Sequence, residues 1–228
     1  MTVTLITGAN KGLGYETARR LIAQGHSVYL GARSPELGEA AASELGGQFV
    51  QLDVTDDASV EAALDVVDER EGHLDVLVNN AGVSSTADVS GPVALRVFDT
   101  NSIGLIRVTQ AALPLLQKSE NPVVVNVSSA LGSFWAVTNP ERRQFHFPSI
   151  VYGASKAAVS MLTVQYAKTY PDIKFNAVEP GFTATDLTPF SGTGQPVEKG
   201  ADVIVRMAII GRDGPTGTFQ EDEHELAW

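Results

Sequence analysis

A tyrosine and a lysine four residues apart, Tyr152 and Lys156, begin a helical stretch of the sequence. On a helix the two side chains project from the same face, about one turn apart. A phenol titrates near pH ~10 in water, and an adjacent ammonium stabilises the phenolate and lowers the phenol pKa. Such a tyrosine can donate a proton to a carbonyl oxygen or accept one from an alcohol. The alternative is an exposed surface pair whose long side chains cover apolar surface. The other motifs of the sequence must therefore distinguish a catalytic pair from a surface pair.

A glycine-rich turn follows the first β-branched stretch, residues 2–7. Gly8, Gly12 and Gly14 stand within seven residues, and a helical pattern continues from them to Gly25. Between a strand and a helix, glycines let the backbone turn tightly and approach a pyrophosphate at the positive end of the helix. Glycines also form plain turns, but the position between the first strand and the first helix favours a nucleotide site.

An arginine stands just past the second predicted strand, residues 28–32. In dinucleotide-binding folds an acid near this point binds the ribose 2′-hydroxyl of NAD, whereas an arginine accepts the 2′-phosphate of NADP. Here Arg33 occupies the position, no acid appears before Glu36, and Lys11 offers a second cation. A charge-assisted hydrogen bond contributes roughly 1.5–3 kcal/mol. The pattern therefore favours NADP(H); the alternative is a solvated arginine.

Three more predicted strands end in small or polar residues. Residues 48–53 lead into Asp53-Val54, residues 74–78 into Asn79-Asn-Ala-Gly82, and residues 123–127 into Ser128-Ser129. Ligands of open parallel sheets bind at the carboxyl ends of the strands. These residues are therefore candidates for one site, although serine pairs after strands also form ordinary turns.

Asn101 lies inside a long helical pattern that continues to about residue 117, with Gly104 three residues later. Both residue types cost helix stability, so something other than propensity must keep them there. A functional asparagine and close helix packing at Gly104 are both consistent with the sequence.

The alternation of strand and helix predicts an α/β fold. We expect a single doubly wound, Rossmann-type parallel sheet of about seven strands with helices on both faces. The predicted strands end with residues 173–178 and 217–219, and the later helices cover residues 55–68, 152–169 and 197–210. No linker divides the chain, so residues 1–228 are predicted to form one domain.

Two irregular stretches, residues 130–151 and about 182–200, are predicted to be substrate loops. The first is rich in aromatic residues and could roof an apolar pocket or cover a protein interface. Leu131, Trp135 and Phe182 are the candidate substrate contacts, because their side chains suit an apolar ketone, aldehyde or quinone. Residues 188–196 are rich in Gly, Pro, Ser and Thr and are predicted to form a mobile loop.

Composition excludes several classes of function. The formal net charge of −11 argues against nucleic acid or an anionic membrane as a partner. The chain has no cysteine, so disulfides and thiolate chemistry are excluded. His26, His73, His146 and His224 are scattered, so no metal site is expected. No apolar leader or membrane-spanning stretch is evident, and a cytoplasmic location is expected.

Taken in order, these motifs resemble the short-chain dehydrogenase/reductase family over nearly the whole chain. The glycine turn is similar to the family's Thr-Gly-x3-Gly-x-Gly element, and Asn79-Asn-Ala-Gly82 to its Asn-Asn-Ala-Gly element. Tyr152 and Lys156 match Tyr-x3-Lys, and Pro180-Gly181 with Thr185 matches the segment that faces the nicotinamide. Lys11 and Arg33 resemble the NADP-preferring, carbonyl-reductase-like branch.

The resemblance implies NADPH-dependent reduction of a carbonyl. In that reaction Tyr152 would be the acid, and Ser129 would donate a hydrogen bond to the substrate oxygen. Lys156 would bind the nicotinamide ribose, and Asn101 would hold a water chain. It implies cofactor contacts from Gly8, Asn10, Lys11, Gly12, Leu13, Gly14, Arg33, Asp53, Val54, Asn80, Ala81, Gly82, Tyr152, Lys156, Pro180, Gly181, Thr183 and Thr185.

Two alternatives stay open: an NADP-dependent alcohol dehydrogenase working in the oxidative direction, and an NADPH sensor without turnover.

The interval between Ser129 and Tyr152 is longer than the common family spacing, and the C-terminus lacks the Asp-Gly-Gly ending of many tetrameric members. Both departures favour a monomer, with a dimer as the second choice.

Overall fold

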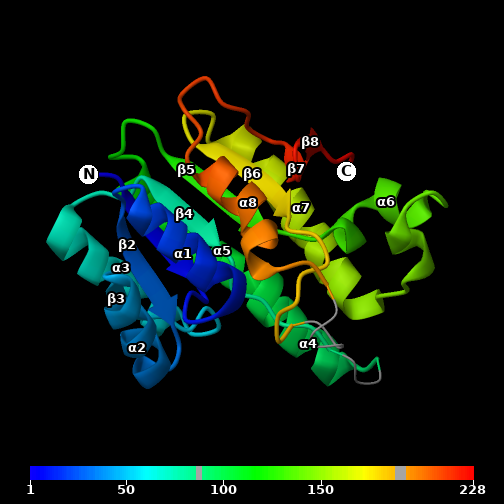
Figure 1. Cartoon of the computed structure of the whole chain (residues 1–228), viewed down its shortest axis with the longest axis horizontal. Helices are drawn as coiled ribbons and strands as arrows, with labels where there is room; N and C mark the ends of the chain where they lie inside the picture. Colours follow the sequence, from blue (N-terminus) through cyan, green and yellow to red (C-terminus); the bar gives the residue numbers. More distant parts are fainter. Residues whose placement is uncertain (86–88, 188–193) are drawn as a thin grey trace.

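One sheet of eight strands runs through the computed structural model, which describes residues 1–85, 89–187 and 194–228 (Figure 1). The strand order is β3-β2-β1-β4-β5-β6-β7-β8. The strands are β1 (Val3–Thr7), β2 (Ser27–Ala32), β3 (Gln48–Gln51), β4 (Val76–Asn79), β5 (Val123–Val127), β6 (Lys174–Glu179), β7 (Phe219–Glu221) and β8 (His224–Glu225). All neighbouring pairs are parallel except β7 and β8. The order reverses between β1 and β4, which is where such sheets bind ligands at their carboxyl edge.

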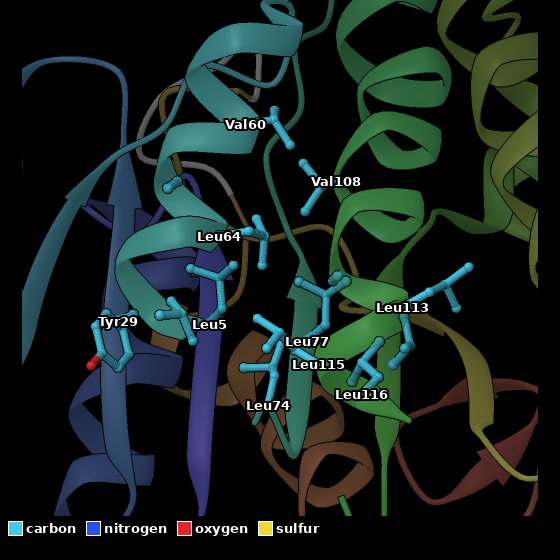
Figure 2. Packing of buried hydrophobic residues seen from close by; sticks show 14 of the residues in the cluster. Leu5, Tyr29, Val60, Leu64, Leu74, Leu77, Val108, Leu113, Leu115 and Leu116 are labelled. Atoms are coloured by element: carbon cyan, nitrogen blue, oxygen red, sulfur yellow. The ribbon is translucent and has the colours of Figure 1, made fainter. Parts of the chain in front are cut away.

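Helices cover both faces of the sheet, as predicted. Helices α1 (Gly12–Ala23), α2 (Pro35–Leu45) and α8 (Val197–Ala208) pack on one face; α3 (Asp57–Glu71), α5 (Gly104–Leu116) and α7 (Ile150–Thr169) pack on the other. Successive strand residues point to opposite faces, so Leu5 joins the cluster under α3 and α5 (Figure 2) while Ile6 joins the cluster under α1 and α8. The predicted doubly wound α/β fold is confirmed.

Capping residues at both ends determine where helix α3 begins and ends. Helix α3 begins after Asp56, whose side chain accepts a hydrogen bond from the Ala58 amide at 3.0 Å. It ends at Gly72, which adopts a φ of 72° that a glycine tolerates without strain. The helix is thus shifted by two to three residues from the predicted range 55–68, because the cap and the glycine decide its ends.

The acidic stretch 220–225 has the composition of an exposed tail, but its first two residues lie in the sheet. Gln220 and Glu221 belong to β7, which pairs with Ala177–Glu179 of β6, and a short antiparallel β8 follows. Gln220 is buried, while residues 222–225 are exposed. The polar composition of this stretch concealed β7, which pairs with β6 on one side and with the short edge strand β8 on the other.

Residues 130–151 form short helical turns rather than an irregular loop. These are η2 (Ala130–Gly132), α6 (Phe134–Thr138) and η3 (Arg143–His146), which extend beyond the sheet beside the N-terminus of α7 (Figure 1). The Trp135 amide donates to the Trp228 carbonyl at 3.1 Å, and the Trp228 ring stacks on Phe219 at 5.3 Å between centroids. Residues 130–151, called the insertion below, therefore pack against the last residues of their own chain.

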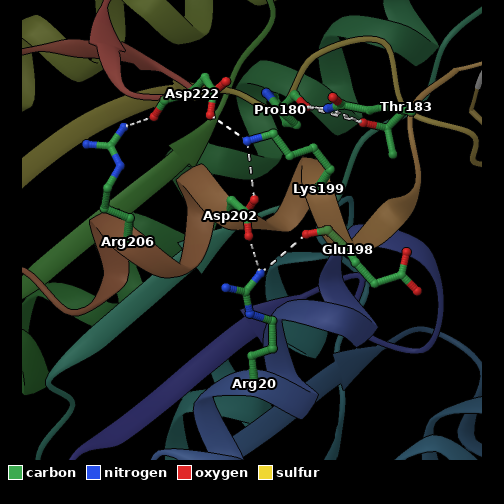
Figure 3. Close-up of polar contacts among 9 residues, drawn as sticks. Arg20, Pro180, Thr183, Glu198, Lys199, Asp202, Arg206 and Asp222 are labelled. Atoms are coloured by element: carbon green, nitrogen blue, oxygen red, sulfur yellow. Dashed lines mark hydrogen bonds and ion pairs between the residues drawn. The ribbon is translucent and has the colours of Figure 1, made fainter.

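Ion pairs hold α8 against α1 and the turn between β7 and β8 (Figure 3). Arg20 pairs with Asp202 at 2.7 Å, and Lys199 pairs with Asp222 at 2.7 Å. Two residues before α8, the Gln195 side chain donates to the Pro180 carbonyl. The network thus anchors the segment that returns to the sheet edge after β6.

Of the predicted mobile loop, residues 188–196, the first six (188–193) lie outside the described residues.

Candidate active site

The glycine turn forms a cradle between β1 and α1. Gly8 and Gly12 have φ values of 65° and 57°, which favour glycine. A Cβ at Gly14 would lie 2.6 Å from the Gly8 carbonyl oxygen, so the turn has no room for a side chain there. No side chain caps α1, which leaves its first amide groups available to an anion. The cradle fits a pyrophosphate on both grounds.

Asn80 fixes this turn from the neighbouring strand end. Its side-chain amide donates to the Thr7 carbonyl at 2.8 Å and to the Gly8 carbonyl at 3.1 Å. The Thr7 hydroxyl in turn accepts from the Asn80 and Ala81 amides at 3.0 and 2.9 Å. The Asn80 side chain therefore positions the cradle; its direct contact with the cofactor stays a prediction. Thr7 is the first residue of the glycine-turn motif, but sequence reasoning gave it no role of its own. The structure shows it as a positioning residue, because its hydroxyl accepts from two amides at the end of β4.

The two cations predicted for a 2′-phosphate differ in their surroundings. Arg33 is exposed at the end of β2. Lys11 forms an exposed ion pair with Asp186 at 2.7 Å, from the segment after β6. A phosphate at Lys11 would have to share that lysine with Asp186, whereas Arg33 is the cation at the end of β2 itself. Of the other predicted cofactor contacts, Asn10, Leu13 and Asp53 are partly buried and Val54 is buried.

The catalytic candidates come together from three elements at the carboxyl edge of the sheet. Ser129 follows β5, and Tyr152 and Lys156 lie in the first two turns of α7. A hydrogen bond links the side chains of Ser129 and Tyr152. The Lys156 ammonium lies 5.7 Å from the centre of the Tyr152 ring and donates to the Val127 carbonyl at 2.7 Å. This grouping supports the pairing that the spacing predicted.

The structure explains why the second serine is the candidate. The Ser128 hydroxyl is buried and donates to the Lys156 carbonyl at 3.1 Å, so it joins β5 to α7. Ser129 is only partly buried and begins η2, where its oxygen accepts from the Leu131 amide at 3.3 Å. Its hydroxyl thus lies on the open side of the strand end.

Asn101 occupies a π-helix, η1 (Asp99–Ile103), between α4 (Gly91–Phe98) and α5. Its buried side chain accepts from the Val83 amide at 2.8 Å and donates to the Ser155 hydroxyl at 3.0 Å. It therefore connects the segment after β4 to α7. Widened turns of this kind are frequent at functional sites.

Close packing at Gly104, the other interpretation of this helix, is also present. A Cβ at Gly104 would lie 2.9 Å from the Val54 carbonyl oxygen. The two explanations that the sequence left open are therefore compatible.

Burial controls the titration of the catalytic pair. Burial raises the pKa of the Tyr152 phenol, the charge of Glu179 raises it further, and the Ser129 hydrogen bond opposes both. The expectation that Lys156 lowers the Tyr152 pKa is therefore wrong in this structure, because the ammonium binds the Val127 carbonyl instead of the phenol. Burial also lowers the pKa of Lys156 to about 8, with Glu179 acting in the opposite direction.

Gly132 lets the serine loop pack directly on the catalytic helix. A Cβ at this position would lie 2.4 Å from the Lys156 carbonyl carbon and 2.6 Å from the Ala157 amide nitrogen. Both are backbone atoms that cannot move aside without shifting α7 or the loop.

We expect Gly132→Ala to lower kcat by roughly tenfold to 10²-fold, because a displacement of about 1 Å between catalytic groups has an effect of that order. Steady-state kinetics and a thermal melt measure activity and folding separately. Gly211→Ala is the matched control, since nothing lies within 4 Å of a Cβ there. Equal kcat in the two variants would contradict this packing argument.

The segment predicted to face a nicotinamide runs over the same edge. Gly181 has a φ of 77°, and the buried Thr183 hydroxyl donates to the Gly181 carbonyl at 3.1 Å. Thr185 approaches the glycine turn, since a Cβ at Gly12 would lie 3.6 Å from its methyl group. Thr183 therefore shapes the turn, and direct cofactor contact from it stays a prediction.

The candidate substrate contacts are partly exposed beside this edge. Trp135 and Phe182 expose 43% and 42% of their surfaces, enough to contact an apolar molecule. Arg143 of η3 lies over the Phe182 ring at 5.9 Å, and Arg142 lies over Trp135 at 5.4 Å. Leu131 is partly buried in η2. The insertion and the segment after β6 thus meet at this edge.

Sequence reasoning also missed Glu179, the last residue of β6. Its carboxylate is buried and accepts hydrogen bonds from the Ala130 and Gly181 amides. The available signal was a charged residue at the end of a buried apolar strand, next to the Pro180-Gly181 turn.

Within residues 1–85, 89–187 and 194–228, no helix is long and apolar enough to cross a membrane.

Comparisons with known proteins agree with this geometry. The model of the short chain dehydrogenase family matches residues 2–195. The (−)-isopiperitenone reductase of Mentha piperita is 33% identical, covering 98% of this chain and 97% of that protein. The (+)-neomenthol dehydrogenase of Capsicum annuum is 29% identical, with 94% of each chain covered. An NADPH-bound carbonyl reductase from chicken fatty liver superposes with a TM-score of 0.86 at 28% identity over 100% of both chains.

Proposed function

Because the chain belongs to the short-chain dehydrogenase family, we propose that it reduces a ketone, aldehyde or quinone to an alcohol with NADPH. The observation that carries the proposal is the meeting of Ser129, Tyr152 and Lys156 at the carboxyl edge of the sheet, beside the glycine cradle. An anion-binding turn and a phenolic acid at one edge suit hydride transfer to a carbonyl. The reductase relatives and the NADPH-bound structural neighbour support the same direction of reaction.

The glycine turn would bind the cofactor, and Ser129 and Tyr152 would act on the substrate. Gly8 to Gly14 and the N-terminus of α1 would hold the pyrophosphate of NADPH, which when bound supplies the hydride. Ser129 and Tyr152 would donate hydrogen bonds to the substrate oxygen and so stabilise the negative charge that develops on it. Tyr152 would then transfer its proton. The Tyr152 phenol is protonated at neutral pH and can donate its proton, although burial raises its pKa and makes it a weaker acid than a free phenol.

Lys156 and Asn101 would support the reacting groups. The Lys156 ammonium, within reach of the Tyr152 ring and near the segment after β4, would bind the nicotinamide ribose. Asn101 would keep that segment against α7 through Val83 and Ser155. Trp135 and Phe182 would contact an apolar substrate.

The proposal is tested by NADPH consumption with a panel of apolar ketones, aldehydes and quinones. We expect turnover with at least one class and slower turnover with NADH. Tight NADPH binding without turnover across the panel would contradict the reductase and favour the sensor.

Arg33 is expected to supply most of the preference for NADPH. Replacing it with alanine removes a charge-assisted hydrogen bond, so kcat/KM for NADPH should fall about tenfold or more while that for NADH is unchanged. Arg212→Ala is the control, because Arg212 is exposed and pairs with Glu120 before β5, at the opposite edge of the sheet. An unchanged ratio of the two cofactors would place the 2′-phosphate elsewhere.

A further inference from the structure

One buried carboxylate joins the two loops that carry the reacting groups. Glu179 is 9% exposed at the end of β6. One of its oxygens accepts from the amide of Ala130, the residue after Ser129, and the other accepts from the amide of Gly181 at 3.1 Å. A single side chain therefore fixes the loop after β5 relative to the turn after β6.

The same carboxylate faces the catalytic side chains. The Ser129 hydroxyl lies within hydrogen-bonding reach of both this carboxylate and the Tyr152 phenol. The charged groups around the carboxylate are Lys156 of α7 and the pair formed by Arg142 of the insertion and Glu221 of β7, at 3.0 Å. Burial raises the pKa of the Glu179 carboxyl, Glu221 raises it further, and the donors from Ala130, Ser129 and Gly181 oppose this.

We propose that Glu179 is a positioning residue, whose carboxylate sets the place of the Ser129 hydroxyl relative to both Tyr152 and the segment that faces the nicotinamide. This inference rests on the proposed function, and it assigns to that site a residue that neither touches substrate nor belongs to the glycine turn. The side chain acts through Ser129 and Gly181.

Only a carboxylate can make both contacts. Each of its oxygens accepts a hydrogen bond from a backbone N–H, whereas glutamine offers one acceptor and would direct its own N–H groups at the second donor. Leaving a buried donor without a partner is costly, so the loop would move to relieve it. A shift of about 1 Å in Ser129 is enough to lower the rate on the order of 10²-fold.

Three variants separate positioning from simple support of the fold. Glu179→Gln removes the charge and one acceptor, and Glu179→Asp keeps the charge but is too short to span both loops. Asn176→Ala is the matched control, because Asn176 lies on the same strand and bonds to Pro215 and Thr218 instead. We expect kcat to fall between about tenfold and 10²-fold in both Glu179 variants, with NADPH binding retained. Asn176→Ala should lower the melting temperature and leave kcat unchanged.

A second readout needs no substrate. The amide resonances of Ala130 and Gly181 should move together as Glu179 titrates in the wild type, with one midpoint above that of an ordinary glutamate. The kcat/KM profile, which reports groups of the free enzyme, should fall on the acid side with the same midpoint, and Glu179→Gln should abolish both changes. This NMR titration also applies if Glu179→Gln does not fold, because it is made on the wild type.

The outcomes distinguish the two proposals. A wild-type kcat/KM that does not change as Glu179 titrates, or a Glu179→Gln variant with wild-type kcat, would overturn the positioning role. A chain that reduces no carbonyl while both amides follow Glu179 would overturn the proposed reductase and support the bridge between the loops.

Discussion

Tyr152→Phe is expected to lower kcat for carbonyl reduction by about 10²–10⁴-fold, the usual contribution of a positioned general acid. The variant keeps the ring beside Lys156 and removes only the hydroxyl that bonds to Ser129. NADPH affinity should stay within a few-fold of wild type, since the glycine cradle is untouched. Single-turnover kinetics with excess enzyme measure the chemical step, and fluorescence titration measures NADPH binding.

Tyr170→Phe is the matched control for this change. Tyr170 ends the same helix and stacks on Tyr166 at 6.1 Å, far along α7 from the sheet edge. It should retain wild-type kcat. Near wild-type turnover by Tyr152→Phe would remove Tyr152 from the mechanism.

Lys156→Ala is expected to lower kcat/KM for NADPH by about 10–10²-fold, equivalent to a lost charge-assisted hydrogen bond of roughly 1.5–3 kcal/mol. The cause is the loss of an ammonium that is buried beside Tyr152 and close to Gly82. Lys168→Ala provides the control, because Lys168 lies in the last turn of the same helix and is exposed.

The pH profile of kcat/KM for NADPH tests the same lysine, because this parameter reports groups of the free enzyme. The pKa of Lys156 is lowered to about 8, so the cation is lost as the pH rises through that value. NADPH capture by the wild type should therefore decline above pH about 8. Lys156→Ala should be flat over this range. A wild-type profile without this decline, or the same decline in the variant, would contradict the role of the ammonium.

Much of the fold was predictable because its signals are local. Apolar runs such as Leu74–Val78 and the alternation with helices predicted a parallel sheet, and the glycines at 8, 12 and 14 marked the turn after β1. The order of Ser129, Tyr152 and Lys156 along the chain likewise predicted residues that the structure brings to one edge.

The remaining features depend on contacts that a linear pattern does not contain. The Tyr152 pKa is set by burial and by Glu179, which is 27 residues away in sequence on another strand, rather than by the lysine one turn away. Residues 130–151 gain order by packing on Trp228 and Ala227, and the Gln220–Glu221 pair becomes a strand because β6 offers an open edge. Each case is a long-range effect that overrides local composition.

The most direct test of the proposed reaction is transfer of deuterium from NADPH labelled at C4 of the nicotinamide to the product alcohol. The two prochiral labels are supplied separately with a carbonyl substrate from the panel, and the product is analysed by mass spectrometry and NMR. Hydride transfer across a fixed nicotinamide predicts deuterium at the former carbonyl carbon from one label and none from the other. Tyr152→Phe should form the labelled product about 10²–10⁴-fold more slowly. Alcohol without deuterium from either label would contradict direct hydride transfer and with it the proposed function.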